Sequence, residues 1–353
     1  MTPPNTHDIH KGTLPFPRSL PEFQKLFPTD VACAAYLERC RWADGFACPS
    51  CGKRGDPFRF AAKPGVLRCR ACRHDVSLTA GTVMHRTHSP LSTWFWASYL
   101  VSTQTPGMSA CQFARQLGLS RYETAFQILH KLRCGMVRPN VDRIGGDGVA
   151  VELDETLVGG RTRGEGRGVH HKAYVVGAVE ALQRAPLEDA NKATTRQKRR
   201  SGTYAGRLRL RVIPDRTAKS LLDFSRESIS QGSAIRTDDW GGYSQLDTEC
   251  GVRHTIHREL GDSEVAEQYL PLIHLVFSNL KAWLQGTHHA VSEKHLQAYL
   301  NEFTFRFNRR FYPFNGFRSL LGIGAACEAP TYDELYADTC AHPVAQGPWE
   351  LTG

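Results

Sequence analysis

Apolar residues change their spacing near residue 148, and this change divides the sequence into two parts. Before it the spacing is helical, because apolar side chains recur every three or four positions across 20–41 and 91–137, with a break at 105–107. After it, four stretches are typical of strands: "VAVELDE", "AYVVGAVE", "RLRLRVIP" and "SAIRTDD". Helical patterns lie between and after these strands, at 217–230, 271–285 and 292–308. We therefore predict a multidomain α/β protein in which a helical N-terminal part precedes a domain built on a sheet.

Composition and charge favour a globular protein with an anionic partner. The chain has 353 residues, of which 41% are apolar and 22% are charged, and these shares suffice for a packed core. Its formal net charge of +9 suits a nucleic acid, although many basic proteins bind none. We find no signal peptide in the first 30 residues and no apolar run of the length that spans a bilayer. We therefore expect a cytoplasmic protein without a membrane partner.

Four of the 11 cysteines have the spacing C-x2-C-x17-C-x2-C: Cys48, Cys51, Cys69 and Cys72. Each short spacer lets one turn direct two thiolates at the same ion, and this spacing is typical of a zinc site. A tetrahedral site with four thiolates leaves no position for chemistry, so we predict a structural Zn²⁺ within a ribbon over 45–85. The other cysteines are scattered, which favours a reduced compartment over a disulfide framework.

A helix-turn-helix pattern occupies residues 108–133. Ser109 and Ser120 are placed as N-caps of two helices, and Gly118 lies in the turn between them. Apolar positions of the second helix face inward, which leaves an outer face for DNA: Arg121, Tyr122, Gln127, His130, Lys131 and Arg133. A helical hairpin inside a core gives the same pattern, so both interpretations are open. The zinc ribbon upstream favours DNA, with Arg121, Lys131 and Arg133 as the predicted contacts.

Two aspartates follow strand patterns. "VAVELDE" alternates, with Val149, Val151 and Leu153 on one face and Ala150, Glu152 and Asp154 on the other. Asp238 comes directly after the short strand in "AIRTDD". Two carboxylates at the ends of neighbouring strands are what a site for two divalent metal ions needs. Taken singly, an aspartate at a strand end is more often a cap or a turn former.

The helical pattern that begins near residue 271 contains no acid, although many two-metal nucleases take their third ligand from such a helix. At 100° per residue, Ile273, Val276, Phe277 and Leu280 form its buried stripe. His274 and Lys281 then lie together on one flank of that stripe. The side chain nearest to the strand ends is therefore a histidine, which is more often structural than a ligand when it stands alone.

Five motifs, in this order, resemble the bacterial insertion-sequence transposases of the DDE type that carry an N-terminal zinc ribbon (family fifteen-ninety-five, ISXO-type group). They are "RWADGFACPSCG", "CRACRHDVSLTAGTVMHRT", "LDETLVGG", "TDDWGGY" and "SNLKAWLQGTHHAVSEKHLQAYLNEFTFRFNRR", and the resemblance extends from about residue 23 to residue 318. It implies a ribonuclease-H-like catalytic domain that cleaves DNA and transfers strands with Mg²⁺ or Mn²⁺. The family's pattern of two aspartates, a third residue and a basic residue seven positions later gives the expected catalytic set: Asp154, Asp238, His274 and Lys281.

The third of these residues departs from the family's usual pattern, in which a glutamate stands at this place. An imidazole suits Mn²⁺ and other transition ions better than Mg²⁺. It can also hold a water molecule or move a proton near neutral pH. Glu264 and Glu267 lie shortly upstream and are the alternatives for this role.

Further DNA contacts are expected from two basic segments. In the glycine-rich segment 159–168 and just after it, backbone N–H groups and cations can approach phosphates, although a solvated connection between strands has the same composition. The residues expected to contact DNA there are Arg161, Arg163, Arg167 and Lys172. In "EFTFRFNRRFYPFNGF" the aromatic rings suit packing against the sheet, so Arg309 and Arg310 are the expected contacts.

The sequence thus predicts an N-terminal tail with short helices, a zinc ribbon, a helical DNA-binding region, a ribonuclease-H-like transposase domain with a basic insertion at 181–206, and a C-terminal tail. The predicted bounds are 1–44, 45–85, 86–140, 149–320 and 321–353. The expected partners are double-stranded DNA, as terminal inverted repeats and target, and further copies of the chain in a dimer or larger assembly. On DNA, the cytoplasmic protein would associate with the bacterial nucleoid. Two alternatives are an inactive or domesticated zinc-ribbon DNA-binding regulator and a nuclease without strand transfer.

Overall fold

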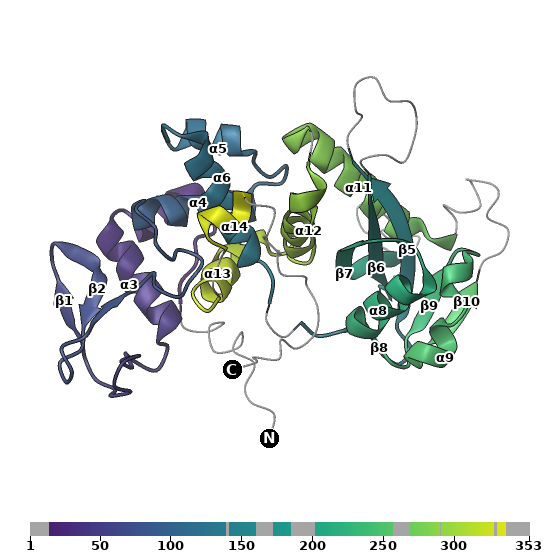
Figure 1. Cartoon of the computed structure of the whole chain (residues 1–353), viewed down its shortest axis with the longest axis horizontal. Helices are drawn as coiled ribbons and strands as arrows, with labels where there is room; N and C mark the ends of the chain where they lie inside the picture. The colour runs from purple at the N-terminus through teal and green to yellow at the C-terminus, as the bar shows by residue number, and fades with distance from the viewer. Residues whose placement is uncertain are drawn as a thin grey trace, which may run out of the picture. The chain divides into compact units, whose positions relative to one another are not determined.

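The computed structural model describes residues 14–138, 141–159, 172–184, 202–256, 269–289, 291–327 and 330–336. They form two compact units (Figure 1). One combines the chain up to Arg138 with a segment that begins at Arg309, and the other spans Pro139–Asn308. Within the described ranges, no helix combines the length and the apolar character needed to cross a bilayer.

The first unit begins with two short helices and a small antiparallel sheet of order β1-β2-β3. These elements are α2 (Leu20–Leu26), α3 (Asp30–Arg41), β1 (Phe58–Phe60), β2 (Lys63–Arg68) and β3 (Asp75–Ser77). Ser19 and Thr29 cap the two helices through their hydroxyls, as serine and threonine at N-caps do. The guanidinium of Arg59 on β1 donates two hydrogen bonds to the Glu38 carboxylate on α3, at 3.2 and 2.7 Å. The sheet is thereby fixed to α3, so the helix and the ribbon form one body.

The described residues of the first unit form five further helices: α4 (Leu91–Thr103), α5 (Ala110–Gln116), α6 (Tyr122–Cys134), α13 (Pro313–Gly324) and α14 (Tyr332–Tyr336). The expected break at 105–107 is confirmed, because α4 ends before it and Ser109 caps α5 through a 3.2 Å bond from the Gln112 N–H. Gly118 has φ +61°, a left-handed turn conformation that favours glycine. The prediction that Ser120 caps the second helix was wrong. Helix α6 begins at Tyr122, so Arg121 stands at its N-cap, and the Arg121 side chain makes no capping hydrogen bond.

Helix α13 packs in the first unit, so residues 309–320 do not continue the transposase domain as the sequence had indicated. Phe317 on α13 is fully buried, with its ring 5.8 Å from that of Phe23 and 6.1 Å from that of Phe95. Aromatic pairs at such distances contribute beyond their buried area. We did not predict this helix, although Phe317, Leu320, Leu321 and Gly324 recur at helical spacing along it and all are buried.

The second unit contains a five-stranded sheet of order β10-β9-β5-β6-β7. The strands are β5 (Ala150–Val158), β6 (Ala173–Gln183), β7 (Thr203–Ile213), β9 (Ala234–Thr237) and β10 (Arg253–Ile256). β5, β6 and β7 form an antiparallel meander, whereas β9 runs parallel to β5 and β10 parallel to β9. A separate two-stranded sheet pairs β4 (Ile144–Gly145) with β8 (Ile229–Ser230). The four strands expected from the sequence are confirmed, and β10 was missed.

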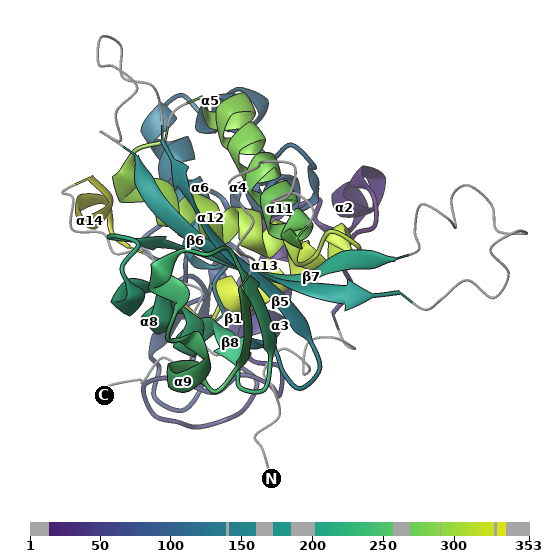
Figure 2. The same ribbon diagram turned by 90° about the vertical axis from the view of Figure 1, so that its right-hand side faces the viewer.

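Helices cover both faces of this sheet, as Figure 2 shows for α8 and α11. On one face, Val151 and Leu153 pack with α8 (Ala218–Ser228), the short helix η1 (Gly241–Tyr243) and α9 (Leu246–Cys250). On the other face lie α11 (Pro271–Trp283), the π-helical turn η2 (Leu284–His288) and α12 (Glu293–Phe307). The alternation expected along β5 is therefore confirmed, and Glu152 and Asp154 belong to the face that α11 covers.

Side chains at α12 satisfy backbone groups along β7, which among the described strands has a neighbour on only one side. The Leu208 N–H donates to the Asn308 side-chain oxygen at 2.8 Å, and the Val212 N–H donates to that of Gln297 at 3.0 Å. Covering an edge in this way prevents the N–H groups from recruiting another strand.

Candidate active site and zinc site

Asp154 and Asp238 are brought to the same level of the sheet by the pairing of β5 with β9. Ala150 pairs with Ala234 and Glu152 with Arg236, so Asp154 and Asp238 each follow the last paired residue of their strand by two positions. Burial raises the pKa of Asp238, and the negative charge of Asp154 raises it further. The two carboxylates therefore repel each other across a short distance. A divalent cation between them would relieve this repulsion, and oxygen ligands of this kind suit Mg²⁺ and Mn²⁺.

His274 joins Asp154 from the first turn of α11. Its Nε2 lies 3.3 Å from Asp154 Oδ2, and both side chains are partly exposed. An imidazole nitrogen and a carboxylate oxygen at this distance can share a proton or ligate the same ion. The structure thus places two of the expected residues, Asp154 and His274, in contact, and Asp238 lies within reach of the charge of Asp154.

A buried glutamate fixes the start of α11. Glu152 is 1% exposed, and its Oε2 accepts hydrogen bonds from the N–H groups of Leu272 at 2.8 Å and Ile273 at 2.9 Å. The first N–H groups of a helix have no partner within the helix, and a negative charge there is favourable. Burial raises the pKa of Glu152, while these two N–H groups oppose the rise. The strand that bears Asp154 therefore also caps the helix that bears His274.

Gly177 allows α11 to approach the sheet closely. It lies on β6 directly opposite Asp154. A Cβ atom at this position would come within 2.9 Å of Phe277 Cε1 and 3.0 Å of Ile273 Cδ1, closer than real Cβ atoms approach. The absence of a side chain here thus permits the contact between His274 and Asp154.

Lys281 reaches the same face of β5 two turns further along α11. Its Nζ donates to the Thr156 hydroxyl at 2.7 Å. Burial lowers the pKa of Lys281, the charge of Asp154 opposes this, and the nearby Lys172 lowers the pKa further. Lys172, which we expected to contact DNA, is exposed just before β6. Lys281 thus places a positive charge within reach of Asp154, and Lys172 lies within electrostatic reach of Lys281.

Glu155 is a carboxylate of this region that the sequence patterns did not single out. It accepts a short hydrogen bond from the Tyr243 hydroxyl, and its Oε1 lies 3.5 Å from Arg216 Nη1. Burial raises its pKa to about 6, the charges of Asp154 and Asp238 act in the same direction, and Tyr243 and Arg216 oppose them. The signal was present in the sequence, because Glu155 continues the apolar face of Val149, Val151 and Leu153. A charged residue at such a position needs a partner within the fold.

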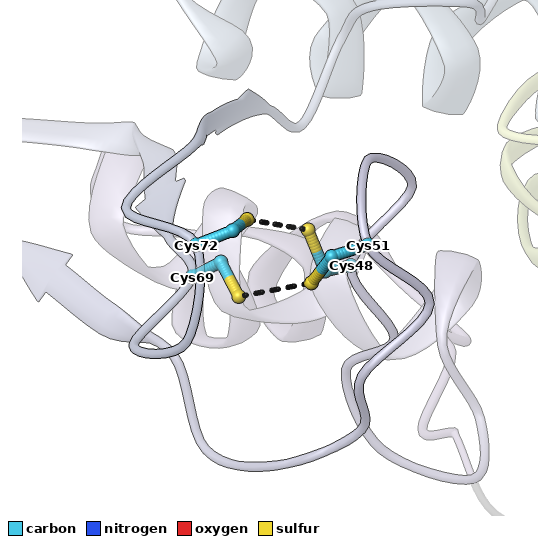
Figure 3. A group of neighbouring side chains, drawn as sticks. All are labelled: Cys48, Cys51, Cys69 and Cys72. Carbon is cyan, nitrogen blue, oxygen red and sulfur yellow. Dashed lines mark hydrogen bonds between the residues drawn. The ribbon is translucent and has the colours of Figure 1, made fainter.

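The four cysteines expected to bind zinc meet from two loops of the ribbon, as Figure 3 shows. Their Sγ atoms all lie within 4.8 Å of one another, with Cys48 3.6 Å from Cys72 and Cys51 3.8 Å from Cys69. Zn–S bonds of about 2.3 Å in a tetrahedron require sulfur atoms about 3.8 Å apart. The arrangement therefore fits a structural zinc ion.

Both zinc-binding loops have the same backbone conformation. The Gly52 N–H donates to the Cys48 carbonyl at 2.9 Å, and the Arg73 N–H donates to that of Cys69 at 3.0 Å. The donors have φ +70° and +62°, in the left-handed region. One loop fills this position with glycine and the other with arginine, a residue that rarely adopts it.

The predicted outer face of α6 is only partly exposed. Arg121 is exposed and Lys131 is half-buried, with its Nζ 3.1 Å from the His85 carbonyl to which it donates. Arg133 and His130 are 2% and 0% exposed, so their prediction as outward-facing residues was wrong. The ring of Tyr336 on α14 lies 5.7 Å from that of Phe126, so α14 packs against α6.

Of the other residues expected to contact DNA, the structure describes two arginines near the end of α12, and the rest lie outside the described residues. Arg309 and Arg310 are partly exposed, and burial together with the charge of Arg138 lowers the pKa of Arg309 to about 9. The Arg310 guanidinium lies 4.5 Å from the centre of the Phe311 ring. Several further predictions lie outside the described residues: Arg161, Arg163, Arg167, most of the basic insertion, and the alternative third residues Glu264 and Glu267.

Comparison with known families gave two matches. A family model described as an ISXO2-like transposase domain matches residues 145–308, and one described as a transposase zinc-ribbon domain matches residues 28–75. Searches of curated proteins and of solved structures gave no match. The first matched range contains Asp154, Asp238, His274 and Lys281, and the second contains all four cysteines of the ribbon.

Proposed function

Because the chain belongs to the IS1595-type insertion-sequence transposases, we propose that it binds the ends of its own DNA element, cleaves them and joins them to a target. The observation that carries this proposal is the 3.3 Å contact of His274 Nε2 with Asp154 Oδ2, together with the charge of Asp154 acting on Asp238. The strand order, with β9 and β10 parallel to β5 and helices on both faces, supports a ribonuclease-H-like catalytic domain.

The proposed reaction has two steps. Hydrolysis of one phosphodiester at the end of the element releases a 3′-hydroxyl, and this hydroxyl then attacks a phosphodiester of the target. When bound, two divalent ions would activate the attacking oxygen and stabilise the leaving oxygen. Asp154 contacts His274 and its charge acts on Asp238, so Asp154 is the proposed bridging ligand, with Asp238 as the second carboxylate ligand.

His274 and Lys281 would complete the site from α11. His274 either provides a nitrogen ligand, which favours Mn²⁺, or accepts a proton from the attacking water. The charge of Lys281 lies within reach of Asp154, and Lys281 is the proposed contact to a phosphate or to the terminal base. Both side chains depend on the position of α11, which Glu152 and Gly177 set.

The N-terminal unit would recognise the ends of the element. Its ribbon holds one structural zinc ion at Cys48, Cys51, Cys69 and Cys72, and α5 and α6 provide a helix pair with Arg121 exposed at the turn. Handling two ends together requires a dimer or a larger assembly on double-stranded DNA. We place this activity in the bacterial cytoplasm, at the nucleoid.

A DNA-binding regulator without catalysis is the second candidate, and His274 in place of a glutamate is the feature that favours it. A strand-transfer assay separates the candidates. Duplexes with the terminal repeat that flanks the gene and a free 3′-hydroxyl are incubated with supercoiled plasmid and Mg²⁺ or Mn²⁺. We expect joined products with the natural chain and none with Asp238→Asn. Binding of the duplex with no product from either protein would favour the regulator, and cleavage of blunt ends without joining would favour a nuclease.

The third residue is tested by two further variants in the same assay. We expect His274→Ala to lose at least about tenfold in rate, as the removal of a metal ligand or proton acceptor does. Glu267→Ala should retain the natural rate. The reverse result would assign the role to Glu267 and leave the two-aspartate site intact.

A further inference from the structure

Arg216 lies beside the aspartate pair in the connection between β7 and α8 and is held from two sides. Its guanidinium carbon lies 3.5 Å from the centre of the Trp240 ring, and Trp240 Nε1 donates to the Arg216 carbonyl at 3.0 Å. Its Nη1 lies 3.5 Å from Glu155 Oε1, and the Tyr243 hydroxyl donates to the other oxygen of that carboxylate. Two other segments of the chain, β5 and the turn at 240–243, thus hold this cation.

The position of this cation relates it to the candidate active site. Its charge lowers the pKa of Asp238 against the effect of burial, so Asp238 lies within its electrostatic reach. The backbone N–H of Trp240 donates to Asp238 Oδ1 at 3.1 Å. The residue that stacks on Arg216 therefore lies in the same turn as this aspartate. Two cations therefore lie near Asp154 and Asp238. Arg216 approaches from Glu155, and Lys281 approaches from α11.

The ion pair with Glu155 does not use the whole guanidinium. Glu155 is only 6% exposed, so Arg216 compensates a buried charge, yet the Arg216 side chain is itself 43% exposed and Trp240 is 38% exposed. A stacked guanidinium with exposed N–H groups is a form in which arginine recognises phosphate, because its N–H fork loses little entropy on binding.

We propose that Arg216 binds a non-bridging oxygen of a DNA phosphate adjacent to the one that Asp154 and Asp238 position for reaction. Trp240 and Glu155 act as positioning residues, since they orient the guanidinium and need not touch the DNA. A strand would then be held by Arg216 on one side of the carboxylates and by Lys281 on the other. The proposal rests on the proposed function for the identity of the ligand.

The test combines neutral phosphates with arginine variants. Terminal-repeat duplexes carry a methylphosphonate, which has no charge, at one phosphate at a time around the expected cleavage point. Binding to the full-length, zinc-loaded protein is measured by fluorescence anisotropy, without divalent metal, as a function of salt. The proteins are the natural chain, Arg216→Ala, Arg216→Lys and Trp240→Ala, and melting curves followed by circular dichroism check that each is folded. Arg226→Ala is the matched control, because its side chain is 45% exposed on α8 and pairs with Glu249 and Asp223.

We expect one methylphosphonate position to weaken binding by the natural chain about tenfold, and Arg216→Ala to weaken binding of unmodified DNA by a similar factor. The methylphosphonate at that position should not weaken DNA binding by Arg216→Ala any further. The number of ions released when this variant binds unmodified DNA, taken from the dependence of affinity on salt, should be about one lower than for the natural chain. Arg216→Lys, which keeps the charge without the planar stack, and Trp240→Ala should be intermediate, and Arg226→Ala should match the natural chain. Equal additional losses at every position for Arg216→Ala, or natural affinity of this variant, would overturn the proposal. Failure of the natural chain to cleave DNA would instead refute the proposed function, because this test reads binding alone.

Discussion

Replacing Glu152 tests whether one buried carboxylate positions the helix that bears His274. Glu152→Ala removes the acceptor of the Leu272 and Ile273 N–H groups, of which the Ile273 donor is buried and the Leu272 donor is partly buried. Each buried donor without a partner costs about 1–3 kcal/mol. The rise in the pKa of Glu152 shows that burial already disfavours its charged form, so removal of the charge returns part of this cost. We therefore expect the free energy of unfolding to fall by about 2–5 kcal/mol.

Two measurements and two further variants make this prediction specific. Urea denaturation gives the free energy of unfolding, and hydrogen exchange gives the protection of the amides in the first turn of α11. Glu152→Gln keeps an oxygen acceptor and should lose only about 1 kcal/mol. The control is Glu227→Ala, since that glutamate pairs with Arg211 at 3.0 Å but is 41% exposed, and it should cost less than about 1 kcal/mol. Natural stability and unchanged protection in Glu152→Ala would refute the role of Glu152 as the cap of α11.

Three other changes have defined outcomes. Gly177→Ala forces a Cβ against Phe277 and Ile273, so it should cost about 1–3 kcal/mol in urea denaturation and slow DNA cleavage, whereas Gly65→Ala, which has open space at its Cβ, should do neither. Glu155 has a folded pKa of about 6 against an ordinary value of 4.5, so the stability it contributes is present below pH 4.5 and is lost as pH rises through 6, by about 2 kcal/mol. Glu155→Gln, measured without added divalent metal, should remove this component, and an unchanged pH dependence would contradict it. Cys51→Ser should reduce bound zinc from one ion per chain to well below one and abolish binding of the terminal duplex, while the far-ultraviolet signal of the second unit stays; full zinc retention would argue against the four-cysteine site.

The parts of the fold that the sequence predicted are those with a strong local pattern. β5 and α11 were expected because strict alternation and a helical stripe each bury one side of the element, and burial follows the period. The zinc ligands were expected because two cysteine pairs with the same two-residue spacer are typical of metal sites. β10, with four residues, has no comparable local signal. α13 has one, because its buried residues follow the helical period, but its place in the first unit depends on rings far away in the sequence.

Within the candidate site, the sequence predicted that Asp154 and His274 lie together but not what holds them. Their side chains are in contact at 3.3 Å, and Asp238 follows the strand that pairs with β5. The supporting roles of Glu152, Glu155 and Gly177 depend on contacts across more than 20 positions, which no local pattern reveals. The prediction of the outer face of α6 was partly wrong for the same reason. The helical period placed the Arg133 side chain outside, but its surroundings in the fold bury it.

Single-turnover cleavage of the terminal duplex by Asp154→Asn and Asp238→Asn tests most directly whether the two aspartates form one metal-dependent active site. Each change keeps the size of the side chain and removes one negative charge from the site, and DNA is supplied at saturating concentration with Mg²⁺ or Mn²⁺. We expect both variants to bind the duplex with natural affinity and to cleave it at least about 1,000-fold more slowly, a loss of about 4 kcal/mol in stabilisation of the transition state. Full cleavage by Asp238→Asn would contradict the shared site.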